Sequence, residues 1–445
     1  MSASLVRCLA QLVLFSAALV AGCGGDDTET PAGPAPSVVT CPVVVSETTC
    51  DKSLRPIVFI HGTLGAGDNA EHIAMLFGSN GYCQERFVAV DYNSLGDSPA
   101  LLVDALIDKV LRETGQTKVD LMGHSQGGGH GFTYLSDPAR AARVANYVHI
   151  AGGSEDAPPS GVRTMAITSK ADVTGVSTIT GAEKNVIFET HDHMGVAMSK
   201  EAFVEMYKFL IGKDPQYTEV QCGDEQITLL GKAAAFGSNQ PLPGALVEFY
   251  ELGAEPVTRT KPAVVVTVAA DGTVGPTQVR RGVVYEARAV GPDGKVIGHM
   301  YYTPWKRSDY LVRALLPSAT GITAAITGQI PADDNFSVLI ARYNQRAIRA
   351  DLGDTLAVNG ENVLVPELAN ATTTTVAYFL WDDNKNGVSD KTSPALFNIT
   401  PFIKAVDVFV PAKPPAFVDV AFNGVVLKIP NWPSASEGPT VIMFQ

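Results

Sequence analysis

Six short apolar runs, rich in Val, Ile, Phe and Leu, lie between residues 54 and 213 and alternate with stretches of helical pattern. They span Ile57–Ile60, Phe87–Tyr92, Lys118–Met122, Val144–Ala151, Arg163–Thr168 and Asn185–Glu189. Nearly continuous apolar runs of this length are typical of parallel strands that are buried on both faces. The alternation therefore predicts an α/β fold: an open, mostly parallel sheet with helices on both faces.

Two helices are clearest in this segment. Ser98–Thr114 has an apolar stripe of helical period, begins with a Ser-Pro pair and stops at Gly115. A polar cap, proline in the first turn and glycine after the last turn are the expected boundaries of a helix. Ser199–Leu210 shows the same period, with Ser199 as its predicted N-cap.

From about Cys222 onward, short apolar runs lie between turn residues. The runs are Gln226–Leu230, Leu246–Tyr250, Val264–Val268, Val283–Ala289 and Val408–Val410, and the strongest turn signals are Asp271-Gly272, Pro292-Asp293-Gly294 and Asn359-Gly360. We therefore predict an α/β domain over residues 53–221 and a β-rich region over 222–445. The β-rich region forms either one sandwich or barrel, or two subdomains with a boundary near Pro317.

The N-terminus predicts export. An apolar run, Leu9–Ala21, follows Arg7 and is shorter than the roughly 20 residues of a membrane span. The run ends in Val20-Ala21-Gly22-Cys23, which resembles the lipobox of bacterial lipoproteins. This resemblance predicts a signal peptide over residues 1–22, lipidation of Cys23 and a tether over 23–52. The protein would be anchored to a bacterial membrane, the outer one where the cell has it. An ordinary signal peptide, giving an extracellular protein, is the alternative.

Four cysteines remain beyond the signal peptide: Cys41, Cys50, Cys83 and Cys222. An even number in an exported chain predicts two disulfides. Local spacing favours Cys41–Cys50 with Cys83–Cys222 among the three pairings. The net charge of −13 argues against a nucleic-acid partner, because phosphate binding needs a basic face.

The third predicted strand, Lys118–Met122, runs directly into Gly123-His124-Ser125-Gln126-Gly127. Gly-x-Ser-x-Gly between a buried strand and a helix is the pattern of a nucleophile elbow, in which a sharp turn projects the serine hydroxyl above the strand. Ser125 is therefore the candidate nucleophile.

A serine nucleophile needs a base and an orienting acid, which follow it in chain order in this kind of fold. His193 lies in the loop after the last predicted strand and is the candidate base, with His191 as the alternative. Asp172 follows the preceding strand and is the candidate acid, with Asp156 as the alternative. A tetrahedral intermediate also needs two N–H donors. We expect these at Gln126, after the nucleophile, and at Thr63, whose hydroxyl is a third candidate.

These segments resemble the small bacterial lipases of the α/β-hydrolase superfamily. The resemblance rests on Ile57–Gly65, Gly123–Gly128, Ser169–Asp172 and His193–Gly195, and the Thr63–Gln126 pair resembles the oxyanion hole of a yeast lipase. The second half of the chain resembles that of archaeal long-chain lipases, which carry a β-rich lipid-binding domain. Its segments are 241–245, Tyr310–Arg313, Asp407–Phe409 and Pro430–Trp432. Only about ten residues separate the fourth and fifth strands, so any lid must be small, and we expect it within 66–83.

A second motif lies in the β-rich region. Asp382, Asn384, Asn386 and Asp390 have the spacing of oxygen ligands in a calcium loop, but position twelve is Ser393 rather than glutamate. An Asn-Gly hairpin turn explains the same residues. We expect no required cofactor, with calcium at this loop as the one candidate.

The leading hypothesis is a serine carboxylesterase, a triacylglycerol lipase type of enzyme, whose partner is a lipid or ester substrate. A short-chain esterase or polyester depolymerase is the alternative within the enzymes. A surface lipid-binding or adhesion lipoprotein is the alternative from another class.

Overall fold

The computed structural model describes residues 39–445 except 97, 254–258, 260, 262, 318–320 and 413–415, and the side chains of 321, 322 and 399. The predicted signal peptide, Cys23 and most of the tether lie outside the described residues. Among the described helices, none has the length and apolar character needed to cross a membrane.

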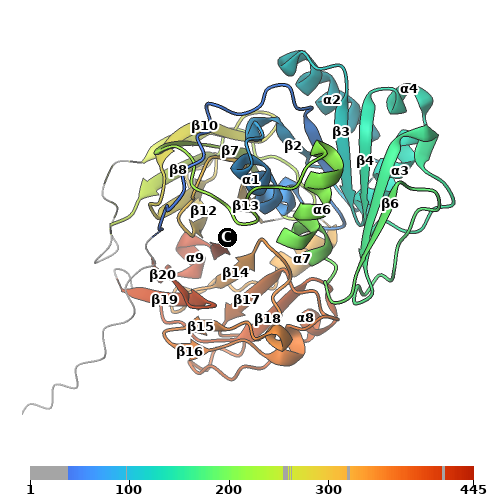
Figure 1. Ribbon diagram of the computed structural model, residues 1–445. Coiled ribbons are helices and arrows are strands. Elements are labelled where there is room, and N and C mark those ends of the chain that lie inside the picture. The colour runs from blue at the N-terminus through green and yellow to red at the C-terminus, as the bar shows by residue number, and fades with distance from the viewer. Residues whose placement is uncertain are drawn as a thin grey trace, which may run out of the picture. The chain divides into compact units, whose positions relative to one another are not determined.

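The α/β domain is built on six parallel strands in the order β2-β1-β3-β4-β5-β6 (Figure 1). The strands are β1 Ile57–Ile60, β2 Phe87–Val90, β3 Val119–His124, β4 Val144–Ile150, β5 Arg163–Ser169 and β6 Lys184–Phe188. All six predicted strands are confirmed, with bounds that differ by at most two residues. The inner strands β1, β3, β4 and β5 are almost wholly buried, as their continuous apolar runs predict, whereas the edge strand β6 is largely exposed.

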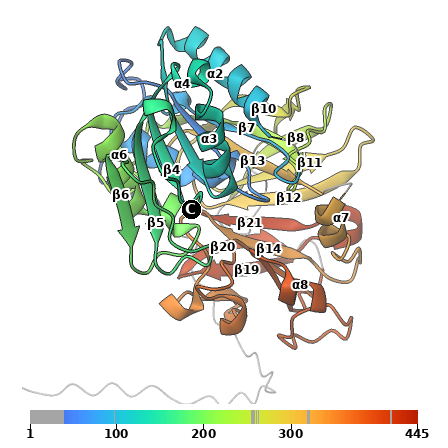
Figure 2. The same cartoon turned by 90° about the vertical axis from the view of Figure 1, so that its right-hand side faces the viewer.

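Helices cover both faces of this sheet. They are α1 Glu71–Ser79, α2 Ala100–Thr114, α3 Gln126–Leu135, α4 Pro138–Ala141, α5 Gly195–Met198 and α6 Lys200–Ile211, with 3-10 turns at Gly67–Ala70, Gln84–Arg86 and Pro159–Gly161. One apolar cluster joins the sheet to α1 and α6, and another joins it to α2 and α3 (Figure 2). Ser199 caps α6 by accepting from the amide of Ala202. α2 begins two residues later than predicted, at Ala100, and is followed by Gly115, whose φ is +69°.

The segment 66–83, where we expected a lid, is a buried part of the core. Every residue of α1 is buried, including the ionisable Glu71. Asp68, just before it, forms an ion pair with Arg342 of the β-rich region at 2.7 Å. Removing one partner of such a buried pair costs about 3–5 kcal/mol. A segment held in this way cannot serve as a mobile cover, so the lid expectation is wrong.

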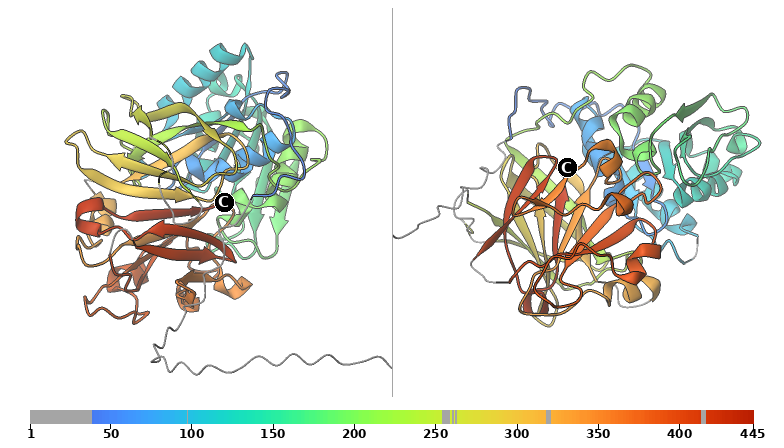
Figure 3. Two further views of the ribbon diagram at one scale, coloured as in Figure 1. Left: turned by 90° about the vertical axis from the view of Figure 1, so that its left-hand side faces the viewer. Right: turned by 90° about the horizontal axis from the view of Figure 1, so that it is seen from below.

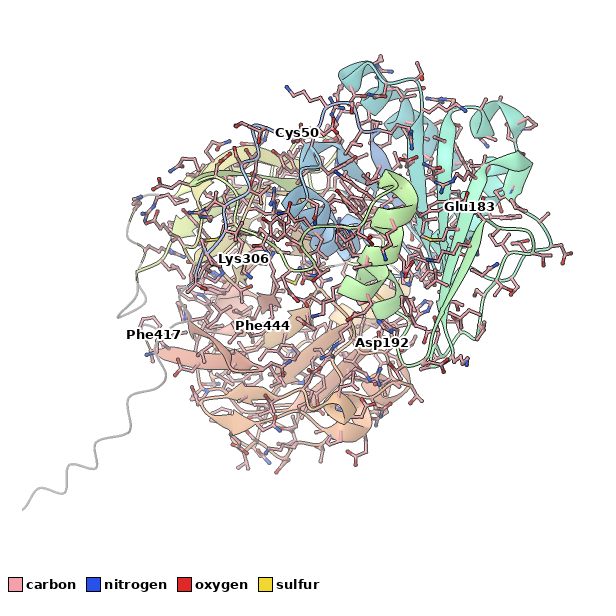
Figure 4. All side chains as sticks on the ribbon, viewed as in Figure 1. Cys50, Glu183, Asp192, Lys306, Phe417 and Phe444 are labelled. Carbon is pink, nitrogen blue, oxygen red and sulfur yellow. A yellow bond between two sulfur atoms is a disulfide. The ribbon has the colours of Figure 1, made fainter. Side chains whose placement is uncertain are left out.

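The predicted disulfide pairing is also wrong. The bonds join Cys41 to Cys222 and Cys50 to Cys83. Isolated β-bridges explain the choice: Val44 pairs with Cys222, and Asp51 pairs with Tyr82. These backbone contacts bring distant segments together, which spacing along the chain does not reveal. Figure 4 labels Cys50.

The described residues of the β-rich region form three sheets. The first has the order β10-β7-β13, the second β18-β17-β14-β21-β12-β11-β8-β9, and the third β16-β15-β19-β20. The strands are β7 Gln226–Ala235, β8 Leu246–Glu251, β9 Val264–Thr267, β10 Thr273–Arg280, β11 Tyr285–Val290, β12 Val296–Tyr302, β13 Asp309–Leu316, β14 Leu339–Tyr343, β15 Leu356–Val358, β16 Glu361–Asn362, β17 Ala377–Trp381, β18 Ile403–Asp407, β19 Phe417–Phe422, β20 Val425–Pro430 and β21 Thr440–Phe444.

The eight-stranded sheet runs across Pro317, because β12 pairs in parallel with β21, the last strand (Figure 3). Short helices α7 Gly321–Thr327, α8 Ala395–Ile399 and α9 Ser434–Glu437 lie between strands. Asn359 and Gly360 both have positive φ between β15 and β16, as the predicted turn requires. Val408–Val410 is not a strand, since the amide of Phe409 donates to the hydroxyl of Ser389 instead of to a neighbouring strand.

Candidate active site

Ser125 occupies a strained turn between β3 and α3. Its φ of +56° is rare for a residue other than glycine and is characteristic of strained positions at functional sites. A Cβ on Gly123 would overlap the backbone of Gly127, and a Cβ on Gly127 would overlap the carbonyl of Ile60. Both glycines are thus required for the close approach of strand and helix that presents the serine.

His193 and Asp172 form a pair, and His193 lines the same cavity as Ser125. His193 Nδ1 lies 2.9 Å from Asp172 Oδ2 and 3.0 Å from Oδ1, and both residues are buried. The hydrogen bonds described for this ring all involve Nδ1, so Nε2 is the nitrogen that remains for the serine proton. His124, which precedes the candidate nucleophile, contacts the backbone of the candidate base. Its Nε2 lies 2.8 Å from the carbonyl oxygen of His193.

The pKa of Asp172 is set by its neighbours. Burial raises the pKa of Asp172, but the hydrogen bond and charge of His193, together with the amide and hydroxyl of Thr174, outweigh burial and lower it overall. An ionised carboxylate in this position would fix the ring with Nδ1–H toward Asp172. The base is then oriented with Nε2 as an acceptor.

The alternative residues lie elsewhere. His191 stacks on Phe188 and lies 3.6 Å from Glu201, on the outer side of its loop. Asp156 is exposed. The geometry therefore favours His193 and Asp172 over His191 and Asp156 as the candidate base and acid.

The loop after β1, which is predicted to bind the oxyanion, lies against Ser125. A Cβ on Gly62 would come within 2.8 Å of Ser125 Cβ, which shows how closely the loop approaches. The amide of Leu64 donates to Ser94 Oγ, and that of Gly65 donates to the carbonyl of Gly62. These two donors are engaged, so the amides of Thr63 and Gln126 remain the candidates. The Thr63 hydroxyl donates to Gln126 Oε1 at 3.0 Å and is not directed at a third site.

Three residues that the sequence did not single out support the site. Asn239 donates from its side-chain amide to the carbonyl of Gly65, in the loop after β1. Phe402 stacks over His193, with ring centroids 6.2 Å apart. Asp192 accepts from the amides of Met194 and Gly195 and lies 3.4 Å from Arg349 of the β-rich region. Figure 4 labels Asp192. No local pattern marks these residues, because their roles depend on contacts across the fold.

A cavity of about 430 Å³ opens at Ser125 and His193. Its volume lies in the usual range for a small-molecule site. The β-rich region supplies much of its wall, which is mostly apolar. Apolar lining residues include Leu64, Met194, Phe236, Ile297, Leu315, Ile340, Ala377, Phe379, Phe402 and Ile403. The wall is thus suited to an extended apolar group attached to a reacting carbonyl.

The predicted calcium-loop residues lie away from this cavity lining. Asp382, Asn384, Asn386 and Asp390 occupy the loop after β17 and are joined by hydrogen bonds within the loop. Asp382 is buried, and the other three are exposed.

Three family models match parts of this chain. The alpha/beta hydrolase fold model matches residues 55–179, and the lipase C-terminal domain model matches residues 225–319. A further C-terminal domain model matches residues 326–445. The first two models support a hydrolytic enzyme and, in general terms, the hydrolysis of lipid esters.

Similarity to solved structures is weak. Bacillus licheniformis lipase BlEst2 in its propeptide form is 12% identical over 52% of this chain and 70% of that chain, with a TM-score of 0.28. A gene product of Listeria innocua is 13% identical over 38% and 98%, with a TM-score of 0.28. Phospholipase PlaB from Legionella pneumophila in complex with thio-NAD is 9% identical over 88% and 93%, with a TM-score of 0.21. At such scores these structures carry no weight beside the family models.

Proposed function

Because the chain belongs to the α/β-hydrolase lipases with a C-terminal β-rich region, we propose that it hydrolyses carboxylic esters of lipids, with acylglycerols as the first candidate substrates. The observation that carries the proposal is that Ser125 and His193 line one mostly apolar cavity, with His193 paired to the buried Asp172.

The proposed reaction is acyl transfer through Ser125. Ser125 Oγ attacks the ester carbonyl carbon while His193 Nε2 takes its proton. Asp172 stabilises the imidazolium, and the amides of Thr63 and Gln126 donate to the oxyanion. Collapse breaks the bond to the alkoxy oxygen, which leaves as the alcohol with the proton from His193.

Water completes the cycle. His193 takes a proton from water, the resulting hydroxide equivalent attacks the acyl-enzyme, and the carboxylic acid departs as Ser125 regains its proton. The apolar lining beyond Ser125 supports acyl chains of medium or long length, since burial of each methylene contributes about 0.8 kcal/mol.

The test compares the wild type with Ser125→Ala on emulsified triacylglycerol and on nitrophenyl esters of increasing chain length, together with fluorophosphonate labelling. Loss of a serine nucleophile is expected to lower kcat on the order of 10⁶-fold. Preference for acetyl esters without activity at the lipid–water interface would instead assign a short-chain esterase. Ester turnover that is unchanged in Ser125→Ala would overturn the proposal and leave lipid binding as the function to test.

A lipid anchor at the N-terminus is a second proposal. We propose that Cys23 is lipidated and that the enzyme is presented to its substrate from a membrane. Mass spectrometry of the mature N-terminus, compared between the wild type and Cys23→Ala, tests it. An unmodified N-terminus in the wild type would rule the anchor out.

A further inference from the structure

The loop after β17 is folded around oxygen atoms. Asp382, buried at its start, accepts from the amides of Asn386 at 3.1 Å and Gly387 at 2.9 Å. Asn384 and Asn386 both donate to Asp390 Oδ2. Gly387 has φ of +73°, as the sharp turn at position six of a calcium loop requires. These features fit a calcium loop, but they also fit a simple turn, so they do not decide between the two.

Asp407, which lies outside the loop, favours a calcium loop over a simple turn. Asp407 ends β18 and is only 1% exposed, yet neither of its carboxylate oxygens has a hydrogen-bond partner. It lies opposite Trp381 in the pairing of β17 with β18, next to Asp382. Burying a carboxylate without partners is costly, and native proteins avoid it unless an ion or another charge compensates.

The carboxylate of Asp407 faces the loop. Around it lie the carboxylates of Asp382 and Asp390 and the backbone amides of Asn384 and Asp390. Lysines that could neutralise the cluster are engaged elsewhere: Lys385 lies near Asp333, and Lys391 pairs with Glu361.

Asp407 also lies beside position twelve of the loop, which has no carboxylate ligand of its own. In a calcium loop, position twelve supplies a carboxylate, but here it is Ser393, whose buried hydroxyl has no partner. The backbone of Asp407 bonds to the amide of Lys391 and the carbonyl of Thr392, the two residues before position twelve. A strand distant in sequence therefore places a carboxylate beside the position where the loop has only a hydroxyl.

We propose that the loop 382–393 and Asp407 together bind one Ca²⁺ ion. Asp382, Asn384, Asn386 and Asp390 supply oxygens from the loop, and Asp407 supplies the carboxylate that position twelve lacks. The donors are all hard oxygens on an adaptable loop, a set that suits Ca²⁺ better than the smaller, strictly octahedral Mg²⁺. The ion joins the ends of β17 and β18, whose residues Phe379 and Ile403 line the cavity.

Terbium luminescence and thermal unfolding test the proposal. Tb³⁺ replaces Ca²⁺, and Trp381, adjacent to Asp382, is expected to sensitise its emission. Asp382→Asn and Asp407→Asn should abolish the emission. Asp383→Asn is the matched control, since it removes a charge from the same loop and keeps the oxygen that accepts from Trp381 Nε1. Ca²⁺ should displace Tb³⁺ from the wild type at lower concentration than Mg²⁺.

The stability of Asp407→Asn separates a ligand from a merely structural residue. In EDTA the variant should unfold at the same temperature as the wild type or higher, because it relieves repulsion among three carboxylates. In Ca²⁺ the wild type should gain several degrees and the variant should gain none. A variant that is less stable under both conditions, or that keeps the wild-type response to Ca²⁺, would overturn the proposal, as would a wild type without a response.

Discussion

The side-chain amide nitrogen of Asn239 lies 3.2 Å from Nε2 of His61. The same nitrogen lies 2.9 Å from the carbonyl of Gly65, and Arg313 donates to the other end of the Asn239 side chain. Asn239 belongs to the β-rich region, whereas His61 and Gly65 flank Thr63 in the loop after β1. The loop proposed to bind the oxyanion is therefore held in shape by the other region of the chain.

Asn239→Ala should lower kcat more than it raises KM. The change removes the donor that positions the loop, and misplacement of catalytic groups by about 1 Å can cost on the order of 10²-fold in rate. Steady-state kinetics on a soluble short-chain ester measure it. Gln240→Ala, at the exposed neighbouring residue, is the control and should behave as the wild type. Equal kinetics for both variants would mean that the loop keeps its shape without Asn239.

Asp172→Asn should lower kcat by about 10⁴-fold, the loss known when the orienting acid of a serine–histidine pair becomes an amide. The amide keeps the size of the side chain but no longer favours Nδ1–H on His193. Asp156→Asn is the matched control, because the same change is made at the alternative acid. Should Asp156→Asn prove the more damaging variant, the acid would have to be reassigned.

Ala377→Phe should change the chain-length preference. Ala377 lines the cavity from β17, and a larger side chain there takes space from an acyl chain. Hydrolysis of long-chain esters should fall about 10- to 200-fold, the range for pocket changes of this kind, while acetyl esters serve as an internal control. An equal loss on all chain lengths would place the acyl chain elsewhere.

Acid should destabilise the fold through its buried neutral histidines. Burial lowers the pKa of His72 and His124 to about 3 and that of His61 to about 4. Below the unfolded value near 6.5 the unfolded chain binds more protons, so stability is lost as pH falls. At pH 5 each group contributes a loss of about 2 kcal/mol.

The His72→Gln variant tests this loss of stability at acid pH, since His72 lies on α1 and is not one of the proposed catalytic residues. Urea unfolding at pH 7 and pH 5 gives the difference in unfolding free energy for each protein. The difference should be smaller in the variant by about 2 kcal/mol. Identical differences would show that His72 is protonated in the folded protein or does not contribute.

Sequence reasoning succeeded where local physics decides. The six strands of the α/β domain were predicted because short, nearly continuous apolar runs are typical of parallel strands, and the strained turn at Ser125 was predicted because glycines flank it between a strand and a helix. The turn at Asn359-Gly360 was predicted because these residues tolerate positive φ. Sequence reasoning failed where the residues in contact lie far apart along the chain. The lid expected within 66–83 is a core helix, and the cysteines pair through bridges that join distant segments.

By itself, the sequence determined the α/β order of elements, the elbow at Ser125 and the candidates for base, acid and oxyanion donors. Periodicity, glycine spacing and chain order carry that information locally. Only the tertiary structure decided that His193 rather than His191 meets Asp172, that Asn239 holds the loop of Thr63, and that Asp407 faces the loop of Asp382. These relationships depend on strand pairing and on packing between regions, which bring together residues with no common local pattern.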